Sequence, residues 1–316
     1  MSDVTTQARL ADGIRAVMED IVIAADGLTA RVGDQEVSAD YPREMTRVLA
    51  EAIYNVYHAG QPLSAVPSRL RDRRIEERLR AVTPQRTTSA QVRLVRLAEE
   101  DDRAKRVLVS YRGVRVWMPV DGVDLDGVGP GDVMTVPFPA LRPAVSPGYF
   151  LVEGARGWTR VAQVMRLYFH LPAVDVADVA WGAVLEHLEN VSAPYRAKIL
   201  TVGEFYPRRD ALVVYTEDTA SDLAYDLAER LAALDVLADD TSPFARRIGP
   251  GAALAMEPRD QASAYSGLSF GQHRATLLAT ALLAAREDPD DREKEVFETF
   301  AQHGVDPTAP ALNLSI

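Results

Sequence analysis

The stretch YRAKILTVGEFYPRRDALVVYT, residues 195–216, carries the clearest fold signal in the sequence. Its two apolar runs, 195–203 and 211–216, are rich in the β-branched and aromatic residues that are typical of strands. The Pro-Arg-Arg-Asp segment between them has the composition of a turn. The stretch therefore predicts two strands joined by a turn.

Outward from this pair, the hydrophobic pattern keeps changing its period. Residues 91–97, 106–111, 114–120 and 161–171 are expected to be strands, and 175–190, 219–236, 271–287 and 289–304 to be helices. A strand-rich block followed by strands mixed with helices is typical of an α+β fold. We expect a mainly antiparallel sheet flanked by helices.

The first 90 residues have a different character. Apolar residues recur at helical spacing over 5–24 and 42–58, with Pro42 in the first turn of the second segment and Gly60 closing it. An Arg-, Pro- and Ser-rich connection follows at 61–91. The sequence thus predicts a helical N-terminal part with an Arg-rich connection over 1–90, and an α+β domain over 91–316.

Composition excludes several classes of site. The 316 residues include no cysteine, and no two of the five histidines have the spacing of a helical zinc motif, so disulfides, thiolate metal sites and a helical zinc motif are excluded. A net charge of −11 argues against a protein that wraps nucleic acid. Without a signal peptide or a membrane-spanning run, the chain is expected to be cytoplasmic and without a membrane partner.

Only three of the 35 basic residues are lysines, and one of them is Lys198 in the predicted strand YRAKIL. Alternation along a strand places Arg196 and Lys198 on the same face. Two readings remain open: an edge strand with a solvated basic face, or a site in which a desolvated lysine beside another cation loses its proton and acts as a general base.

The segment SFGQHR, residues 269–274, begins a predicted helix. His273 and Arg274 precede the buried positions Leu277 and Leu278 by one turn, so both are expected on the inward side of the helix start. Free backbone N–H groups there and an arginine suit an anion such as phosphate. The alternative for His273 is a capping or buried polar role.

Further polar residues interrupt the predicted strands. Arg115 and Arg166 are each typical of a surface or salt-bridged arginine, and they would matter for function only if they converged. Tyr168 and Tyr215 are placed to donate a phenolic hydrogen bond, although core packing is the ordinary role of such tyrosines.

Several segments in the same order resemble the HopA-type effector family, named for a type III effector of plant pathogens. They are GVRVWMP (113–119), SPGYFLVEG (146–154), RLYFHL (166–171), YRAKIL (195–200), ARRIGPGAALAMEP (245–258), SFGQHR (269–274) and VFETFAQHGVDPTAPALN (296–313). Relatives of that family are LanY-type lyases of class V lanthipeptide and thioamitide biosynthesis. The resemblance covers roughly residues 42–313, and no single motif carries it alone.

What the resemblance implies is a phosphoserine/phosphothreonine lyase. A separate kinase, similar to aminoglycoside phosphotransferases, would phosphorylate a precursor peptide made of a leader and a core. The lyase would then eliminate phosphate and leave dehydroalanine or dehydrobutyrine, and the resemblance implies that this needs no metal or redox cofactor. In these roles Lys198 is the expected base and His273 the expected acid, Tyr168 and Tyr215 are possible acids or orienting groups, and the phosphate would be held by Arg196, Arg274, Arg115 and Arg166.

One segment departs from the family pattern, and one alternative function remains. Relatives look richer in aromatic and cysteine residues where this chain has NVYHAG (55–60), and we assign that segment no catalytic role. The alternative is a non-catalytic, effector-like interaction protein that binds the precursor peptide or the kinase.

Overall fold

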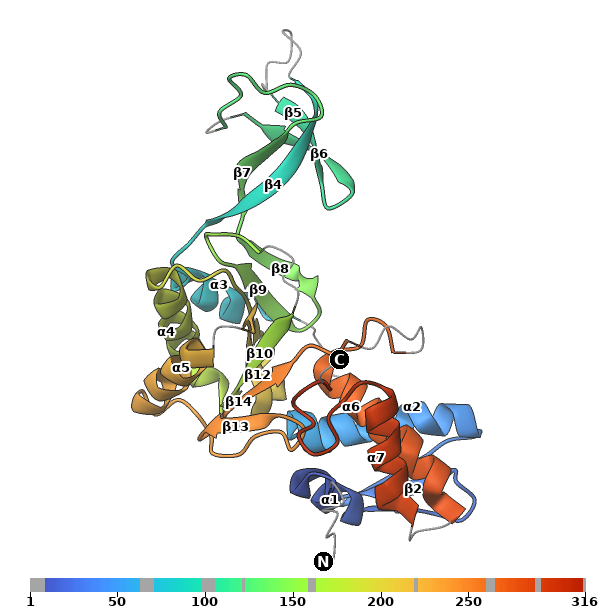
Figure 1. The fold of residues 1–316 in the computed structure, drawn as a ribbon. Helices are drawn as coiled ribbons and strands as arrows, with labels where there is room; N and C mark the ends of the chain where they lie inside the picture. The colour runs from blue at the N-terminus through green and yellow to red at the C-terminus, as the bar shows by residue number, and fades with distance from the viewer. Residues whose placement is uncertain are drawn as a thin grey trace, which may run out of the picture.

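The structure, a computed structural model, describes residues 9–62, 71–97, 106–120, 123–158, 163–218, 221–259, 265–287 and 291–314. These residues form an α+β fold with seven α-helices and three antiparallel sheets (Figure 1). The α+β class and the antiparallel pairing expected from the sequence are thereby confirmed.

The central sheet has seven strands in the order β13-β14-β10-β12-β11-β9-β8. In chain order they are β8 (Leu141–Ser146), β9 (Tyr149–Glu153), β10 (Val164–Leu171), β11 (Arg196–Leu200), β12 (Arg208–Glu217), β13 (Arg246–Gly249) and β14 (Ala252–Met256). The strands β11 and β12 correspond to the pair expected from residues 195–216, and they lie side by side. Because side chains alternate along each strand, the sheet presents two different faces.

One face of this sheet is apolar and fully covered. The side chains of Leu167, Ile199 and Val214 project from this face into a core that also contains Trp181. The covering helices are α3 (Arg73–Ala81), α4 (Ala177–Asn190) and α5 (Ser221–Ala233) (Figure 1). A slip of one residue in strand register would turn these apolar side chains to the other face, so their burial holds the register.

The opposite face is covered only in part. A second core reaches the sheet at Tyr168, Val213 and Ala255. Its helices are α1 (Asp12–Glu19), α2 (Pro42–Ile53), α6 (Phe270–Ala284) and α7 (Arg292–Gln302). Beyond these contacts, Arg196 and Lys198 of β11 are only half-buried. Polar side chains therefore occupy the margin where the helical layer ends.

The N-terminal part is mixed and not mainly helical, so the expectation of a helical N-terminal part was wrong. Between α1 and α2 lies a three-stranded sheet of β1 (Ile21–Ile23), β2 (Thr29–Val32) and β3 (Gln35–Ser38). Ile21, Val32 and Val37 bury its apolar side in the second core. The partial alternation of residues 27–38 indicates a short strand-like piece in the sequence, and β2 and β3 lie within it. Strands of three or four residues gave too weak a signal beside the two helical patterns to change the expectation for the whole part.

A four-stranded sheet stands away from the body of the molecule (Figure 1). Its order is β6-β5-β4-β7, with β4 (Thr87–Arg96), β5 (Arg106–Tyr111), β6 (Val114–Pro119) and β7 (Val133–Pro139). It has a small core of its own around Val92, Val109 and Met134. The boundary expected at residue 90 falls inside β4, the first strand of this sheet.

Two features are absent from the part of the chain that the structure describes. None of its helices combines the length and the apolar character that a bilayer crossing requires. Nor do three or more His, Asp or Glu side chains gather there in a way that could hold a metal ion.

Candidate functional site

A row of polar side chains crosses the partly covered face of the central sheet. Strand register places Glu153 of β9 opposite Arg196 of β11, and Arg196 opposite Tyr215 of β12. Tyr215 in turn lies opposite Arg166 of β10. We call these four residues the polar row. Directly opposed residues of antiparallel strands have neighbouring side chains on one face, so the four groups are adjacent.

Two further predicted residues lie next to the row on the same face. Lys198 of β11 and Tyr168 of β10 both lie opposite Val213 of β12, two residues along from the polar row. The sheet thus brings together five of the residues singled out in the sequence, which are Arg166, Tyr168, Arg196, Lys198 and Tyr215.

Each arginine of the row is held by a carboxylate. The Arg196 Nε atom donates to Oε1 of Glu153 at 2.8 Å, and the Arg166 Nη2 atom donates to Oε1 of Glu257 at 2.6 Å. The Arg166 guanidinium also lies 5.1 Å from the ring centroid of Tyr215, a cation–π distance. These contacts orient both guanidinium groups before any ligand arrives.

Positive charge is in excess at the Glu153 end. This buried carboxylate pairs with Arg196, with Arg142 at 2.9 Å and with Arg112 at 3.3 Å. The Nε atom of Arg142 is buried and has no hydrogen-bond partner among the described residues. A polar cavity of about 370 Å³ adjoins the cluster and is also lined by Arg156. Three guanidinium groups around one carboxylate leave a local surplus that attracts anions.

The other end of the row opens at the start of α6. Arg166 and Tyr215 line a cavity of about 300 Å³ there, together with Glu257, Ser269 and Gln272. Ser269 and Gln272 form a capping box, in which the Gln272 N–H donates to Oγ of Ser269 and the Ser269 N–H donates to Oε1 of Gln272. The capping box satisfies the backbone N–H groups of Ser269 and Gln272. The positive end of the α6 dipole lies at the cavity.

Lys198 lies beside a buried ionic group. Its Nζ atom is 4.1 Å from the ring centroid of Tyr149, and it forms no salt bridge with any described residue. Nearby, Asp210 is buried and paired with Arg208. Burial raises the pKa of Asp210, but the charge and hydrogen bond of Arg208 outweigh that effect, with help from Lys198, and the pKa falls below its ordinary value. Asp210 is therefore a fixed negative charge near Lys198.

His58 is a member of the site that sequence reasoning missed. It lies in a π-helix (Tyr54–Ala59) that continues α2 toward the sheet, and π-turns are frequent at functional sites. The ring is buried, its Nδ1 atom is 2.9 Å from Oγ of Ser242, and its centroid is 5.2 Å from that of Tyr168. Burial lowers the pKa of His58 to about 4, so the ring is neutral at pH 7.

The signal for His58 was present but weak. Tyr54 and His58 are four residues apart on one helix face, and their ring centroids are 5.3 Å apart. Across the contact, a Cβ atom on Gly271 would lie 2.2 Å from the imidazole. The glycine of SFGQHR is therefore where α6 makes room for His58, a relation between segments far apart in the sequence.

Comparison with known protein families identifies the family of this chain. The model of the HopA1 effector protein family matches residues 140–312, more than half of the sequence. The chain belongs to the HopA1 effector protein family. The polar row, Lys198 and Tyr168 all lie inside the matched region, whereas His58 lies outside it.

Two solved structures are similar to this HopA1-family chain, and both are effector proteins of Pseudomonas syringae. The one from pv. tomato strain DC3000 is 15% identical, with 88% of this chain and 92% of that chain covered and a TM-score of 0.49. The one from pv. syringae strain 61 is 16% identical, with 84% and 89% covered and a TM-score of 0.46. No curated protein sequence matches the chain.

In the segment SFGQHR, Arg274 lies beneath the C-terminal stretch that contains Pro310 and Leu312, with His273 beside it. Arg274 has no exposed surface, and its guanidinium donates to the carbonyl oxygen of Pro310 at 2.8 Å and lies 2.8 Å from Nδ1 of His273. Burial lowers the pKa of Arg274 to about 9. His273 is also buried, and its ring centroid is 5.8 Å from that of Tyr265. A phosphate could reach Arg274 only if this stretch moved.

Arg115 is not brought into the HopA1-family site. It lies on β6, exposed, in the four-stranded sheet that stands away from the central sheet (Figure 1). The sequence places Arg115 in a strand, as observed, but sequence alone does not say which sheet a strand joins.

Proposed function

We propose that this chain is a phosphoserine/phosphothreonine lyase that eliminates phosphate from a phosphorylated peptide and leaves dehydroalanine or dehydrobutyrine. One observation carries the proposal. Lys198 lies on the same face of the central sheet as Arg196, Tyr215 and Arg166, so an amine and two guanidinium groups share one face, with Arg196 and Lys198 half-buried and Arg166 buried. A base beside a phosphate-binding row is the arrangement that β-elimination requires.

In this proposal the polar row binds the phosphate and Lys198 removes a proton. Arg196 and Arg166 contact phosphate oxygens, for which each must loosen its pair with Glu153 or Glu257. The Nζ atom of Lys198 takes the proton from Cα of the substrate. The electron pair of the broken C–H bond forms the Cα=Cβ bond, the Cβ–O bond breaks, and its electrons leave with the phosphate.

The leaving phosphate needs a positive or proton-donating environment. Burial raises the pKa of Tyr168, so this phenol keeps its proton at pH 7 and can donate a hydrogen bond to the leaving phosphate. Tyr215 stands within the row between the two arginines. His273 remains a predicted acid, although its Nδ1 atom faces Arg274 in this structure. No step of the proposed reaction requires a metal or a redox cofactor.

The proposal extends to partners. A lyase without a nucleotide-binding motif needs a separate kinase to supply the phosphorylated residue, and we propose a kinase of the aminoglycoside-phosphotransferase type acting on a precursor peptide. Such a pair would form dehydroamino acids in lanthipeptide or thioamitide biosynthesis. In this proposal the substrate class is a peptide carrying phosphoserine or phosphothreonine.

The mass of the peptide product tests the proposal. Purified chain is incubated with a phosphothreonine peptide, and released phosphate is measured beside the peptide mass. Elimination gives a product lighter by one water than the dephosphorylated peptide, whereas hydrolysis gives the dephosphorylated peptide itself. Phosphate release with the hydrolysis product, or no release, would reject the lyase.

A second candidate function is a non-catalytic interaction protein that binds the peptide or the kinase. Its support is that each arginine of the polar row is already paired with a carboxylate, Glu153 or Glu257, as in a structural ion-pair network. The two candidates differ in one measurement. An interaction protein binds the phosphopeptide and releases no phosphate.

A further inference from the structure

A small polar cavity lies where the four-stranded sheet meets the end of β9. Its volume is about 370 Å³, and residues with hydroxyl or amide side chains line it, namely Ser89, Gln91 and Thr135. Arg112 and Arg156 line it as well. Hydroxyl, amide and guanidinium groups all donate hydrogen bonds, so the composition of the cavity suits an anionic group.

The connection that follows β9 is fastened to the four-stranded sheet. The N–H of Ser89 donates to the carbonyl oxygen of Ala155 at 2.9 Å, and the hydroxyl of Thr88 donates to that of Gly154 at 2.6 Å. At Gly157 the two backbones approach so closely that a Cβ atom would lie 2.1 Å from the carbonyl oxygen of Ser89. The walls of the cavity are therefore in place before any ligand binds.

Arginines outnumber carboxylates at this cavity. Glu153 pairs with Arg112, Arg142 and Arg196. Arg156 is exposed and forms no hydrogen bond or ion pair with any residue that the structure describes. Burial lowers the pKa of Arg196, and the charges of Arg112 and Arg142 add to this effect. Glu153 opposes them but does not restore the ordinary pKa, so the cluster keeps a positive charge.

One further carboxylate lies near the cavity. The Oε1 atom of Glu189 accepts from the N–H of Ala155 at 3.0 Å and from the hydroxyl of Tyr195 at 2.8 Å. Together with Glu153, two carboxylates stand against the four arginines of the cluster, so four minus two leaves a surplus of two positive charges among the described residues. Such a surplus attracts anions.

The acidic connections of the four-stranded sheet begin and end away from this cavity. Residues 97–105 and 120–132 are rich in Asp and Glu, and they connect β4 to β5 and β6 to β7. Because neighbouring strands are antiparallel, the turn between β5 and β6 lies at the opposite end of the sheet from both connections. The cavity lies at the end with that turn. Beside it, the connection 154–163 contains Arg156 and Arg160 and no acidic residue.

The backbone at Arg112 indicates a role for its side chain. Arg112 has a φ angle of 50° and Gly113 one of 83°, so both residues of this tight turn are in the left-handed region. Such turns favour Asn-Gly or Gly-Gly, and an arginine there costs stability. In exchange, the Arg112 side chain reaches from the four-stranded sheet to Glu153 of the central sheet. Backbone strain of this kind is typical of functional positions.

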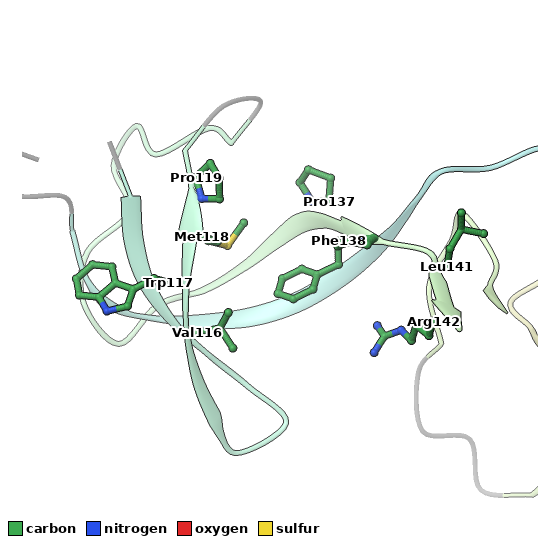
Figure 2. Close-up of a pocket in the computed structure, with 9 residues that line it drawn as sticks. Val116, Trp117, Met118, Pro119, Pro137, Phe138, Leu141 and Arg142 are labelled. Atoms are coloured by element: carbon green, nitrogen blue, oxygen red, sulfur yellow. The ribbon is translucent and has the colours of Figure 1, made fainter. Parts of the chain in front are cut away.

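Arg142 also borders an apolar cleft on the other side of the cluster. The cleft has a volume of about 630 Å³, and Trp117 and Met118 of β6 and Phe138 of β7 line it. Figure 2 shows Arg142 at one end of the cleft, beyond Phe138 from Trp117. Arg142 is the only charged residue among those that line the cleft, and its guanidinium is bound to Glu153. An anionic group is therefore expected in the polar cavity and not in the cleft.

We infer that the polar cavity is a subsite that binds a carboxylate side chain of the phosphopeptide substrate. Arg112 and Arg156 contact the carboxylate, while the phosphate lies at the polar row. A carboxylate is the anion that the unphosphorylated residues of a peptide carry, and a guanidinium group can bind it through two parallel hydrogen bonds. This inference deepens the proposed lyase function and rests on it for the identity of the ligand.

Strand geometry gives the spacing between the two groups. Lys198 and Arg196 are two residues apart on β11, which is about 7 Å, and Glu153 of β9 lies opposite Arg196, about 5 Å away. The cavity at Glu153 is therefore about 10 Å from Lys198, which is about the length of three residues of an extended peptide. We expect the acidic residue three positions from the phosphorylated one.

Two fluorescent phosphothreonine peptides test the subsite. Both consist of Ala and Gly around the phosphothreonine, and they carry either Glu or Gln three residues before it and three residues after it. The long-range field of this acidic chain disfavours the Glu peptide. We nevertheless expect the Glu peptide to bind the full chain about tenfold more tightly in fluorescence anisotropy, the effect of one charge-assisted hydrogen bond. Equal affinities, tighter binding of the Gln peptide, or no binding of either would overturn the subsite.

The product mass, measured on the same two peptides, keeps this test separate from that of the lyase. Tighter binding of the Glu peptide without elimination would support the subsite and reject the lyase. Elimination from both peptides with equal affinity would reject the subsite alone.

Matched variants make the test specific. Arg156→Gln removes a cation that has no described partner, and Arg112→Asn introduces a residue that the turn favours, so both variants are expected to fold. Each should reduce the preference for the Glu peptide to about twofold or less, because a charge-assisted contact is lost. Arg230→Gln on α5 removes an exposed arginine elsewhere and should keep the preference. Full preference in both cavity variants, or its loss in Arg230→Gln, would overturn the proposal.

Discussion

At the residue scale, the site depends on how buried charges are compensated. Glu153 is 2% exposed and neutralises part of the charge of Arg112, Arg142 and Arg196. Removing one member of a buried ionic cluster leaves the others uncompensated, which costs about 3–5 kcal/mol of stability. The same change increases the positive charge that faces an anion.

Glu153→Gln is therefore expected to lower the free energy of unfolding by about 3 kcal/mol and to bind phosphate more tightly. Thermal unfolding with and without added phosphate measures both effects. Glu257→Gln is the control at the other end of the row, where the carboxylate is partly exposed and a smaller loss of stability is expected. If Glu153→Gln gained no stabilisation from phosphate, the cluster would be structural only.

His58 predicts a pH dependence of stability. Burial lowers its folded pKa to about 4, below the ordinary value of about 6.5, so between these values the unfolded chain binds more protons. The stability that depends on a neutral His58 is fully present above pH 6.5. It is lost as the pH decreases toward 4, by on the order of 3 kcal/mol. The pKa of Asp210 is also lowered in the folded chain, and this group changes stability only below its ordinary pKa of about 4.

Urea unfolding at pH 7 and pH 4.5 measures this dependence. His58→Asn removes the titrating ring and should unfold more easily at pH 7 but lose less stability between the two pH values than the wild type does. An equal loss in both proteins would show that another group carries the dependence.

At the element scale, α6 and the π-helix meet at one glycine. Gly271 lies in the first turn of α6, and a Cβ atom there would lie 2.2 Å from the His58 ring. Alanine is a better helix former than glycine by about 1 kcal/mol, so the substitution would stabilise an isolated helix. In this fold the steric conflict dominates, because both elements are buried in the second core.

Gly271→Ala is expected to lower the free energy of unfolding by more than 2 kcal/mol in the wild-type background. In a His58→Ala background the space is free, and the same substitution should be neutral or slightly stabilising. Chemical denaturation of the four proteins completes the cycle. Equal destabilisation in both backgrounds would mean that the two elements do not meet as described.

The elements also show what could be predicted from sequence. Alternation in YRAKIL predicted that Arg196 and Lys198 share one face, because a strand's local period fixes side-chain direction. The pattern of RLYFHL predicted only that Arg166 and Tyr168 lie in a strand. Glu153 ends its strand and carried no local sign that three arginines converge on it. This convergence arises from the pairing of strands that are far apart in the sequence, which a local sequence pattern does not predict.

At the scale of the whole molecule, the central sheet and the four-stranded sheet form separate regions. The central sheet gathers the polar row and Lys198, and the four-stranded sheet stands apart with its apolar cleft (Figure 1). Arg142 and Arg112 join the two regions through Glu153.

The most direct test of this account compares elimination by the wild type and by Lys198→Arg on one phosphothreonine peptide. Arginine keeps the charge but cannot release its proton in the accessible pH range. The account predicts near-normal phosphopeptide binding and a fall in dehydrobutyrine formation of about 10²–10⁴-fold, the usual contribution of a positioned base. Mass spectrometry of the product reads the outcome. Elimination by the variant at the wild-type rate would contradict the assignment of Lys198 as the base.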